Sequence, residues 1–151
     1  EKKDLNSIKN SKEVFSRIIE KYPNTDFAND ANFKINLVDT ILAAKEMYVG
    51  RYYFDRKKWI ASINRFKFVI DNYETTIYTE EALHRLVEIY YLLGLEAEAK
   101  KYANLLGYNY QSSKWYQQSY SIFDKNYQKI QIKKDKNSIL KKLKTLLNVD
   151  E

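Results

Sequence analysis

Apolar residues recur along most of the chain at intervals of three or four positions, the spacing of a helix with one buried face. A first group follows Ser11, which we expect to cap the helix, and ends at the Tyr22-Pro23 pair. Pro cannot continue the helical hydrogen-bond ladder, so this helix is predicted to stop there. The preceding residues 1–10 are polar and lysine-rich and predict a loop or a frayed helix.

The same spacing continues from Phe27 without Pro or Gly as far as Gly50, which predicts one long helix, or two nearly continuous ones, over about residues 27–54. A further helix is predicted over residues 59–73, with these apolar residues facing inward: Ile60, Ile63, Phe66, Ile70 and Tyr73. Later groups predict helices near residues 82–94, 99–106 and 114–126, with a turn at 107–110. One Pro and three Gly in 151 residues leave few turns for a β-rich fold.

An internal repeat runs through this pattern. The motif F-x-x-I-I-E-x-Y at residues 15–22 returns as F-x-x-V-I-D-x-Y at residues 66–73, an offset of 51 residues. The match continues as Thr25 with Thr76, Phe27 with Tyr78, Asp30-Ala31 with Glu81-Ala82, and Lys34-Ile35 with Arg85-Leu86. A tetratricopeptide unit has about 34 residues, so the surplus is placed in a lengthened helix at residues 36–52.

The residues around this long helix have the spacing of a tetratricopeptide helix pair. Small residues at Gly50 and Ser62 allow two helices to approach, and Tyr53, Phe66 and Val69 fill the space between them. We therefore predict an all-α, tetratricopeptide-like right-handed solenoid of helical hairpins, with one lengthened helix and a C-terminal capping helix. The repeat domain is predicted over residues 1–126, with units at about 11–37, 38–73 and 80–107 and a cap at 113–126, followed by a lysine-rich amphipathic tail at 127–151.

The sequence offers little catalytic chemistry. It has no Cys, which excludes thiol nucleophiles, zinc–thiolate sites and disulfides. The single histidine, His84, has Glu80, Glu81 and Glu88 nearby, but acids on a helix surface usually face solvent. Phosphate-binding glycine loops, serine elbows and H-E-x-x-H motifs are absent. We expect no enzyme activity, no cofactor and no metal, and a structural role for His84.

Binding is the remaining class of function. A net charge of +6 and a pI near 9.2 permit nucleic acid, anionic membrane or an acidic protein as partner. Positive charge gathers around Trp59, either as a solvated face or as a docking patch for acidic side chains; its members are Arg51, Arg56, Lys57, Lys58 and Arg65. Tyr52 and Tyr91 are candidate surface anchors, because adjacent residues on a helix diverge by about 100°. The tail lysines are either a solubilising end or a contact for nucleic acid or lipid.

Two segments are similar to a known family. Residues 20–31 read E-K-Y-P-N-T-x-F-A-x-D-A, and residues 42–65 read L-A-x-K-E-x-x-V-x-x-Y-Y-x-x-R-x-x-W-x-A-x-x-N-R. Together they resemble the BamD (ComL) family, tetratricopeptide lipoproteins of the outer-membrane β-barrel assembly machinery. The similarity covers about residues 11–126, and the second segment is the more specific. It departs at Glu74, where a Pro often follows the Tyr.

The resemblance implies a non-enzymatic scaffold at the periplasmic face of the outer membrane of a Gram-negative bacterium. Its C-terminal repeats would bind the membrane-proximal POTRA domain of BamA, with Arg56 and Arg65 meeting acidic residues, and other surfaces would bind accessory Bam lipoproteins. The chain is then expected to be a later fragment, lacking the lipid-modified Cys that alone contacts the membrane. The alternatives are a generic peptide-binding tetratricopeptide adaptor and, less in keeping with the resemblance, a basic nucleic-acid-binding repeat.

Overall fold

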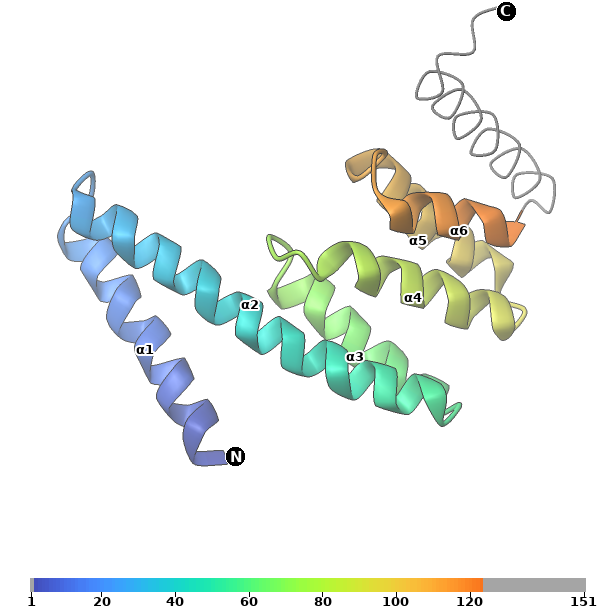
Figure 1. The fold of residues 1–151 in the computed structure, drawn as a ribbon, viewed down its shortest axis with the longest axis horizontal. Helices are drawn as coiled ribbons and strands as arrows, with labels where there is room; N and C mark the ends of the chain where they lie inside the picture. The colour runs from blue at the N-terminus through green and yellow to red at the C-terminus, as the bar shows by residue number, and fades with distance from the viewer. Residues whose placement is uncertain (1, 124–151) are drawn as a thin grey trace, which may run out of the picture.

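The computed structural model describes residues 2–123, which form six helices and no strand (Figure 1). The helices are α1 (Lys2–Lys21), α2 (Asp26–Asp55), α3 (Trp59–Asn72), α4 (Thr79–Leu92), α5 (Glu96–Asn109) and α6 (Lys114–Phe123). This confirms the predicted all-α, tetratricopeptide-like fold class. The predicted tail at 127–151 and the last residues of the predicted cap lie outside the described residues, and the division into repeat units stays a prediction.

Each helix packs against the next one along the chain, and α6 also packs back on α4. The long helix α2 has 30 residues, whereas α3, α4 and α5 have 14 each. Figure 1 shows α1 beside the first half of α2 and α3 beside its second half. Helix α2 therefore joins two helical hairpins, and its second half reaches the contact between α3 and α4.

The tightest point of the fold lies where α2 meets α3. A Cβ added to Gly50 would stand only 2.6 Å from the ring of Phe66, so the aromatic ring fills the space beside the glycine. The Ser62 hydroxyl donates a hydrogen bond of 2.9 Å to the Gly50 carbonyl across the same contact. Phe66 is fully buried and belongs to a core that also contains Met47, Val69, Leu86, Ala99 and Ala103. The small residues singled out in the sequence are thus those that let the two helices approach.

Three local predictions are wrong. Helix α1 begins at Lys2, and the Ser11 hydroxyl donates to the Ile8 carbonyl inside the helix instead of capping it. The lysine-rich start contains no Pro or Gly, and lysine is a good helix former.

Gly107 lies within α5 and not in a turn. Because Gly107 has no Cβ, the ring of Tyr116 can pack against it. Ile60 is 78% exposed, because it lies about 160° around α3 from the buried Ser62.

We predict that Gly50→Ala destabilises the protein, although alanine is normally the better helix former by about 1 kcal/mol. The added methyl group would overlap the Phe66 ring, and overpacking of this kind costs about 1–3 kcal/mol. Urea unfolding followed by circular dichroism measures the change. The double variant Gly50→Ala/Phe66→Leu should lose less than the sum of the two single variants. A stability gain in the single variant would contradict the proposed steric cause.

Candidate partner-binding surface

Tyr52 and Arg56 form an exposed aromatic–cation pair at the end of α2. The guanidinium carbon of Arg56 lies 3.6 Å from the centre of the Tyr52 ring, and Tyr52 is 45% exposed. One guanidinium N–H also points to the Tyr52 carbonyl at 3.4 Å, a long contact. A cation over an aromatic face gains about 0.5–1 kcal/mol at an exposed site, enough to favour one orientation of a long side chain. The pair therefore presents a positive charge to solvent.

Arg65 lies on the outer side of α3 and pairs with Glu46 of α2 at 2.9 Å. Its side chain remains 45% exposed. A shallow pocket of about 310 Å³ beside it is lined by Tyr53, Ala61, Asn64, Arg65 and Phe68. The Tyr53 ring in turn meets the Tyr52 ring edge-on, with centroids 5.6 Å apart.

The structure thus brings three of the predicted residues together through Tyr53. We call this the α2–α3 surface and define it by Tyr52, Tyr53, Arg56, Arg65 and Phe68. Aromatic side chains and arginine are the types that dominate binding energy at protein interfaces. Phe68 was not singled out in the sequence, and Tyr53 was predicted to fill the space between helices instead of lying on a binding surface. The signal for Phe68 was its position three residues after Arg65, on the same helix face.

Trp59 does not share this surface. It is the first residue of α3, half-buried, and its ring meets Phe54 edge-on with centroids 5.5 Å apart. Trp59 packs against the hydrophobic core, and six positions along the helix place Arg65 about 120° away around the axis. The predicted patch is therefore divided, with Trp59 on the side of the core and the two arginines on the outer side.

Tyr91, near the end of α4, is 38% exposed. Its ring packs edge-on against Phe123 of α6, with ring centroids 5.6 Å apart. Part of the tyrosine therefore serves the contact between α4 and α6. Only the remaining exposed part is open to a partner.

Arg51, predicted as a member of the positive cluster, points instead to α4. Its Nε and Nη2 donate to the two carboxylate oxygens of Glu81 at 2.8 and 2.6 Å. Burial alone would raise the pKa of Glu81, but the hydrogen bonds and charge of Arg51, aided by Arg85, outweigh burial and lower this pKa. Hydrogen bonding to Glu81 correspondingly raises the pKa of Arg51. This bidentate pair connects α2 to α4 and is structural.

His84 lies in a small polar site between α4 and α6. It is 4% exposed, its Nδ1 lies 2.8 Å from the Ser119 hydroxyl oxygen, and its ring faces Trp115 at 5.1 Å between centroids. Burial lowers the pKa of His84 below its ordinary value of 6.5, against the opposing charge of Glu88. Among the side chains that the structure describes, no group of three or more His, Asp or Glu residues is placed to hold a metal ion. His84 therefore positions α6 on α4.

Residues 1–106 match the family model YfiO, described as an outer membrane lipoprotein. The chain belongs to this family. The resemblance seen in the sequence is thereby confirmed, because the similar proteins include several named outer membrane protein assembly factor BamD.

The BamD of Rickettsia prowazekii is 55% identical over 118 residues, which cover 78% of this chain and 47% of the relative. The BamD of Caulobacter vibrioides is 45% identical over 109 residues, 72% of this chain and 36% of the relative. The BamD of Neisseria meningitidis serogroup A is 33% identical over 112 residues, 74% of this chain and 42% of the relative. The chain thus spans about half the length, or less, of these family members. None of its six described helices is both long and apolar enough to pass through a bilayer.

For this family member we predict that Glu81→Gln lowers the free energy of unfolding by about 1–2 kcal/mol at pH 7, since Arg51 loses a bidentate carboxylate but stays partly solvated. The effect should shrink as the pH falls below the ordinary glutamate pKa of 4.5, because folding lowers the pKa of Glu81 and the contribution is lost as the pH falls through this lowered pKa. Urea titrations at several pH values measure this. The control Glu13→Gln removes an exposed pair with Arg17 and should change stability by less than about 0.5 kcal/mol.

We also predict that the wild-type free energy of unfolding falls between pH 7 and 5.5. The unfolded chain takes up a proton at His84 near its ordinary pKa of 6.5, while the folded protein resists protonation there. His84 is the only histidine, so His84→Gln should flatten this part of the stability profile. Equal slopes for wild type and variant would show that His84 titrates alike in both states.

Proposed function

We propose that this chain is a non-enzymatic scaffold in outer-membrane protein assembly, acting at the periplasmic face of the outer membrane of a Gram-negative bacterium. Two observations support this. The family is described as outer membrane lipoproteins, and the relatives with 55% and 45% identity are named assembly factors. A solenoid of paired helices also suits this role, because it offers a continuous outer surface without need of a catalytic cleft.

We further propose that the α2–α3 surface binds the membrane-proximal POTRA domain of BamA. The observation that carries this is the state of Arg56, which forms no ion pair with any side chain that the structure describes, while its guanidinium is held outward on Tyr52. A held arginine without a carboxylate can pair bidentately with an acidic side chain of a partner. Arg65 adds a second cation beside a shallow pocket, and its own carboxylate partner occupies only part of its five donors.

Other faces are left for the accessory Bam lipoproteins. The exposed part of Tyr91 is one candidate contact, and Trp59 contributes to binding only by supporting the turn that carries Arg56. Membrane attachment is proposed to come from a lipid anchor, in keeping with the description of the family as outer membrane lipoproteins. Nucleic acid is not expected as a partner, and a generic peptide-binding role is the alternative.

We predict that Arg65→Glu and Arg56→Glu each weaken binding to the isolated POTRA domain by about tenfold, through charge reversal opposite acidic residues. Arg56→Lys should give an intermediate loss, because lysine keeps the charge but not the planar stacking or the bidentate geometry. Calorimetric titration at moderate salt measures the affinities, and circular dichroism checks the fold.

The matched control is Arg17→Glu, an exposed arginine on α1 already paired with Glu13, which should bind as wild type. If all three charge reversals weaken binding equally, general electrostatic attraction is responsible and the α2–α3 surface is not the site. If none does, the POTRA domain binds elsewhere. Strong binding to any polyanion with steep salt dependence would favour the nucleic-acid alternative.

A further inference from the structure

An apolar turn lies exposed between α4 and α5. Its three leucines, Leu92, Leu93 and Leu95, are 62%, 42% and 49% exposed, and we call these residues the leucine turn. A Cβ added to Gly94 in the middle of the turn would meet no atom within 4 Å, so the described structure leaves this side open. Single exposed leucines are ordinary on protein surfaces, but adjacent ones form an apolar patch that usually marks a contact.

The backbone of this turn does not require leucine. The turn between α2 and α3 follows the same course, since Lys57 and Gly94 both have positive φ, at 56° and 73°. The residues that follow them, Lys58 and Leu95, have φ of −86° and −89° and precede α3 and α5. At the positions of the three leucines the other turn carries charged residues: Asp55, Arg56 and Lys58. The leucines therefore indicate a contact that the described residues do not supply.

The chain leaves α6 beside the leucine turn. Phe123, the last residue of α6, packs edge-on against Tyr91, with ring centroids 5.6 Å apart. Tyr91 directly precedes Leu92 in the sequence. In Figure 1, α4 and α6 end on the same side of the molecule. The residues that follow Phe123 therefore start next to the leucine turn.

The sequence after residue 123 contains a segment whose chemistry suits this patch. Within residues 139–147, apolar residues recur at the spacing of one helix face: Ile139, Leu140, Leu143, Leu146 and Leu147. The positions between them carry three lysines. At the edge of the leucine turn, Glu96 and Glu98 begin α5, and their lysine partners are 3.6 and 3.9 Å away, loose contacts that leave the carboxylates open to other cations. An apolar face with basic sides thus matches an apolar patch with an acidic edge.

The connection between the two is long enough. Residues 124–138 reach up to about 50 Å when extended, at roughly 3.3 Å per residue, whereas the leucine turn adjoins Phe123. A short flexible connection also raises the effective concentration of a binding segment to about the millimolar range. A segment of the same molecule is therefore favoured over a second copy or a separate protein.

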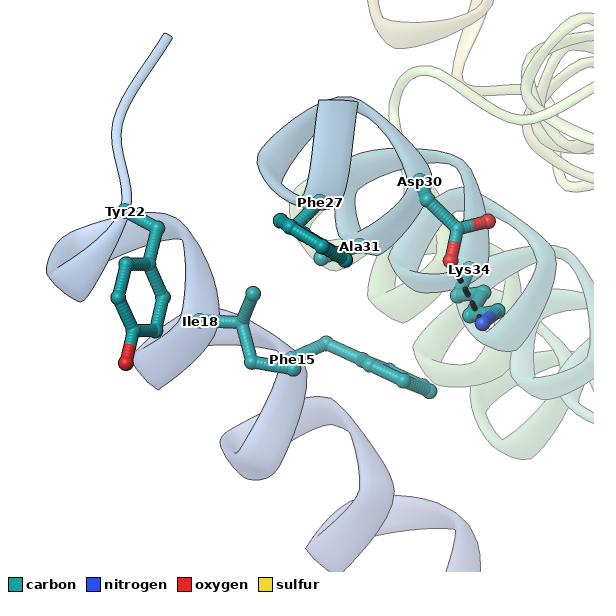
Figure 2. A pocket seen from close by; sticks show the side chains of 7 residues that line it. All are labelled: Phe15, Ile18, Tyr22, Phe27, Asp30, Ala31 and Lys34. Carbon is teal, nitrogen blue, oxygen red and sulfur yellow. Dashed lines mark hydrogen bonds and ion pairs between the residues drawn. The ribbon is translucent and has the colours of Figure 1, made fainter. Parts of the chain in front are cut away.

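A second apolar surface on this protein is a less suitable seat for the segment. This is the groove of about 480 Å³ between α1 and α2, and Figure 2 shows Ile18, Phe27 and Ala31 among the residues that line it. In Figure 1 it lies at the other end of the molecule from the end of α6. The charges at its edge, Asp30 and Lys34, already pair with each other at 2.7 Å. Both the position and the charge of the leucine turn fit the segment better.

We propose that residues 139–147 form a helix whose apolar face covers the leucine turn, with its lysines beside Glu96 and Glu98. This contact fastens the end of α6 to α4 and α5, in addition to the hydrogen bond between His84 and Ser119. The covering segment lies outside residues 1–106, which match the family model. The proposal is independent of the proposed function and of POTRA binding.

Thiol labelling of residues 1–151 tests the proposal, because the chain has no Cys and one introduced cysteine is a clean reporter. Leu95→Cys places the reporter in the leucine turn, and Lys58→Cys is the matched control at the same position of the charged turn. Each reporter is combined separately with Leu143→Asp, which puts a charge on the apolar face. The paired control is Thr145→Asp, which puts the same charge about 200° around the helix.

We expect Leu143→Asp to speed iodoacetamide labelling of Leu95→Cys by about tenfold, because the helix no longer covers the turn. Thr145→Asp should change this rate by less than about twofold, and neither change should affect Lys58→Cys. An unchanged rate with Leu143→Asp would overturn the proposal. Equal acceleration by both substitutions would also overturn it, since charge alone would then be responsible.

Two further measurements test the seat and the source of the segment. Ile18→Cys reports on the groove between α1 and α2, and its labelling rate should not respond to Leu143→Asp; a response there in place of Leu95→Cys would overturn the leucine turn as the seat. Protection by the same molecule should not vary with protein concentration from about 1 to about 50 µM. Protection of Leu95→Cys that grows with concentration would identify a second copy as the occupant and overturn the intramolecular contact.

Discussion

The close approach of α2 and α3 at Gly50 is the contact on which the described structure depends. The Phe66 ring lies where a side chain at Gly50 would be, and the Ser62 hydroxyl bonds the Gly50 carbonyl at 2.9 Å. Because the helices meet so closely here, the next residue of α2, Arg51, reaches Glu81 of α4. One glycine thus allows a single helix to contact two others.

The contact between α2 and α3 at Gly50 also determines which arginines are structural and which are exposed. Arg51 faces α4 and forms a bidentate pair with Glu81, whose side chain is 12% exposed. Arg56, five residues later, lies over Tyr52 at the solvent-facing end of the same helix. Residues of one chemical type within one turn and a half of α2 therefore have different physical roles. Loss of binding after substitution of Arg51 would report a damaged fold, whereas Arg56 and Arg65 can change binding alone.

The polar groups inside the fold position helices more than they add stability. The His84 Nδ1 atom and the Ser119 hydroxyl form a hydrogen bond between α4 and α6, and a shifted α6 would lose this bond. The Arg51–Glu81 pair has the same effect between α2 and α4. Apolar faces alone permit small shifts along a helix, because leucine and alanine contacts are not directional. The buried pairs select one arrangement among them.

The sequence by itself determined the helical periodicity, the family and the internal repeat, because these depend on local spacing and on residue identity. The Gly50, Ser62 and Phe66 contact followed from the same information. Only the tertiary structure decided which side of each helix faces a neighbour. For this reason Arg51 was misplaced in a surface cluster, Ile60 was expected inward, and Trp59 was grouped with Arg65. Periodicity identifies one buried stripe per helix, but α2 and α3 each contact more than one neighbour, and the orientation of the remaining residues is set by those contacts.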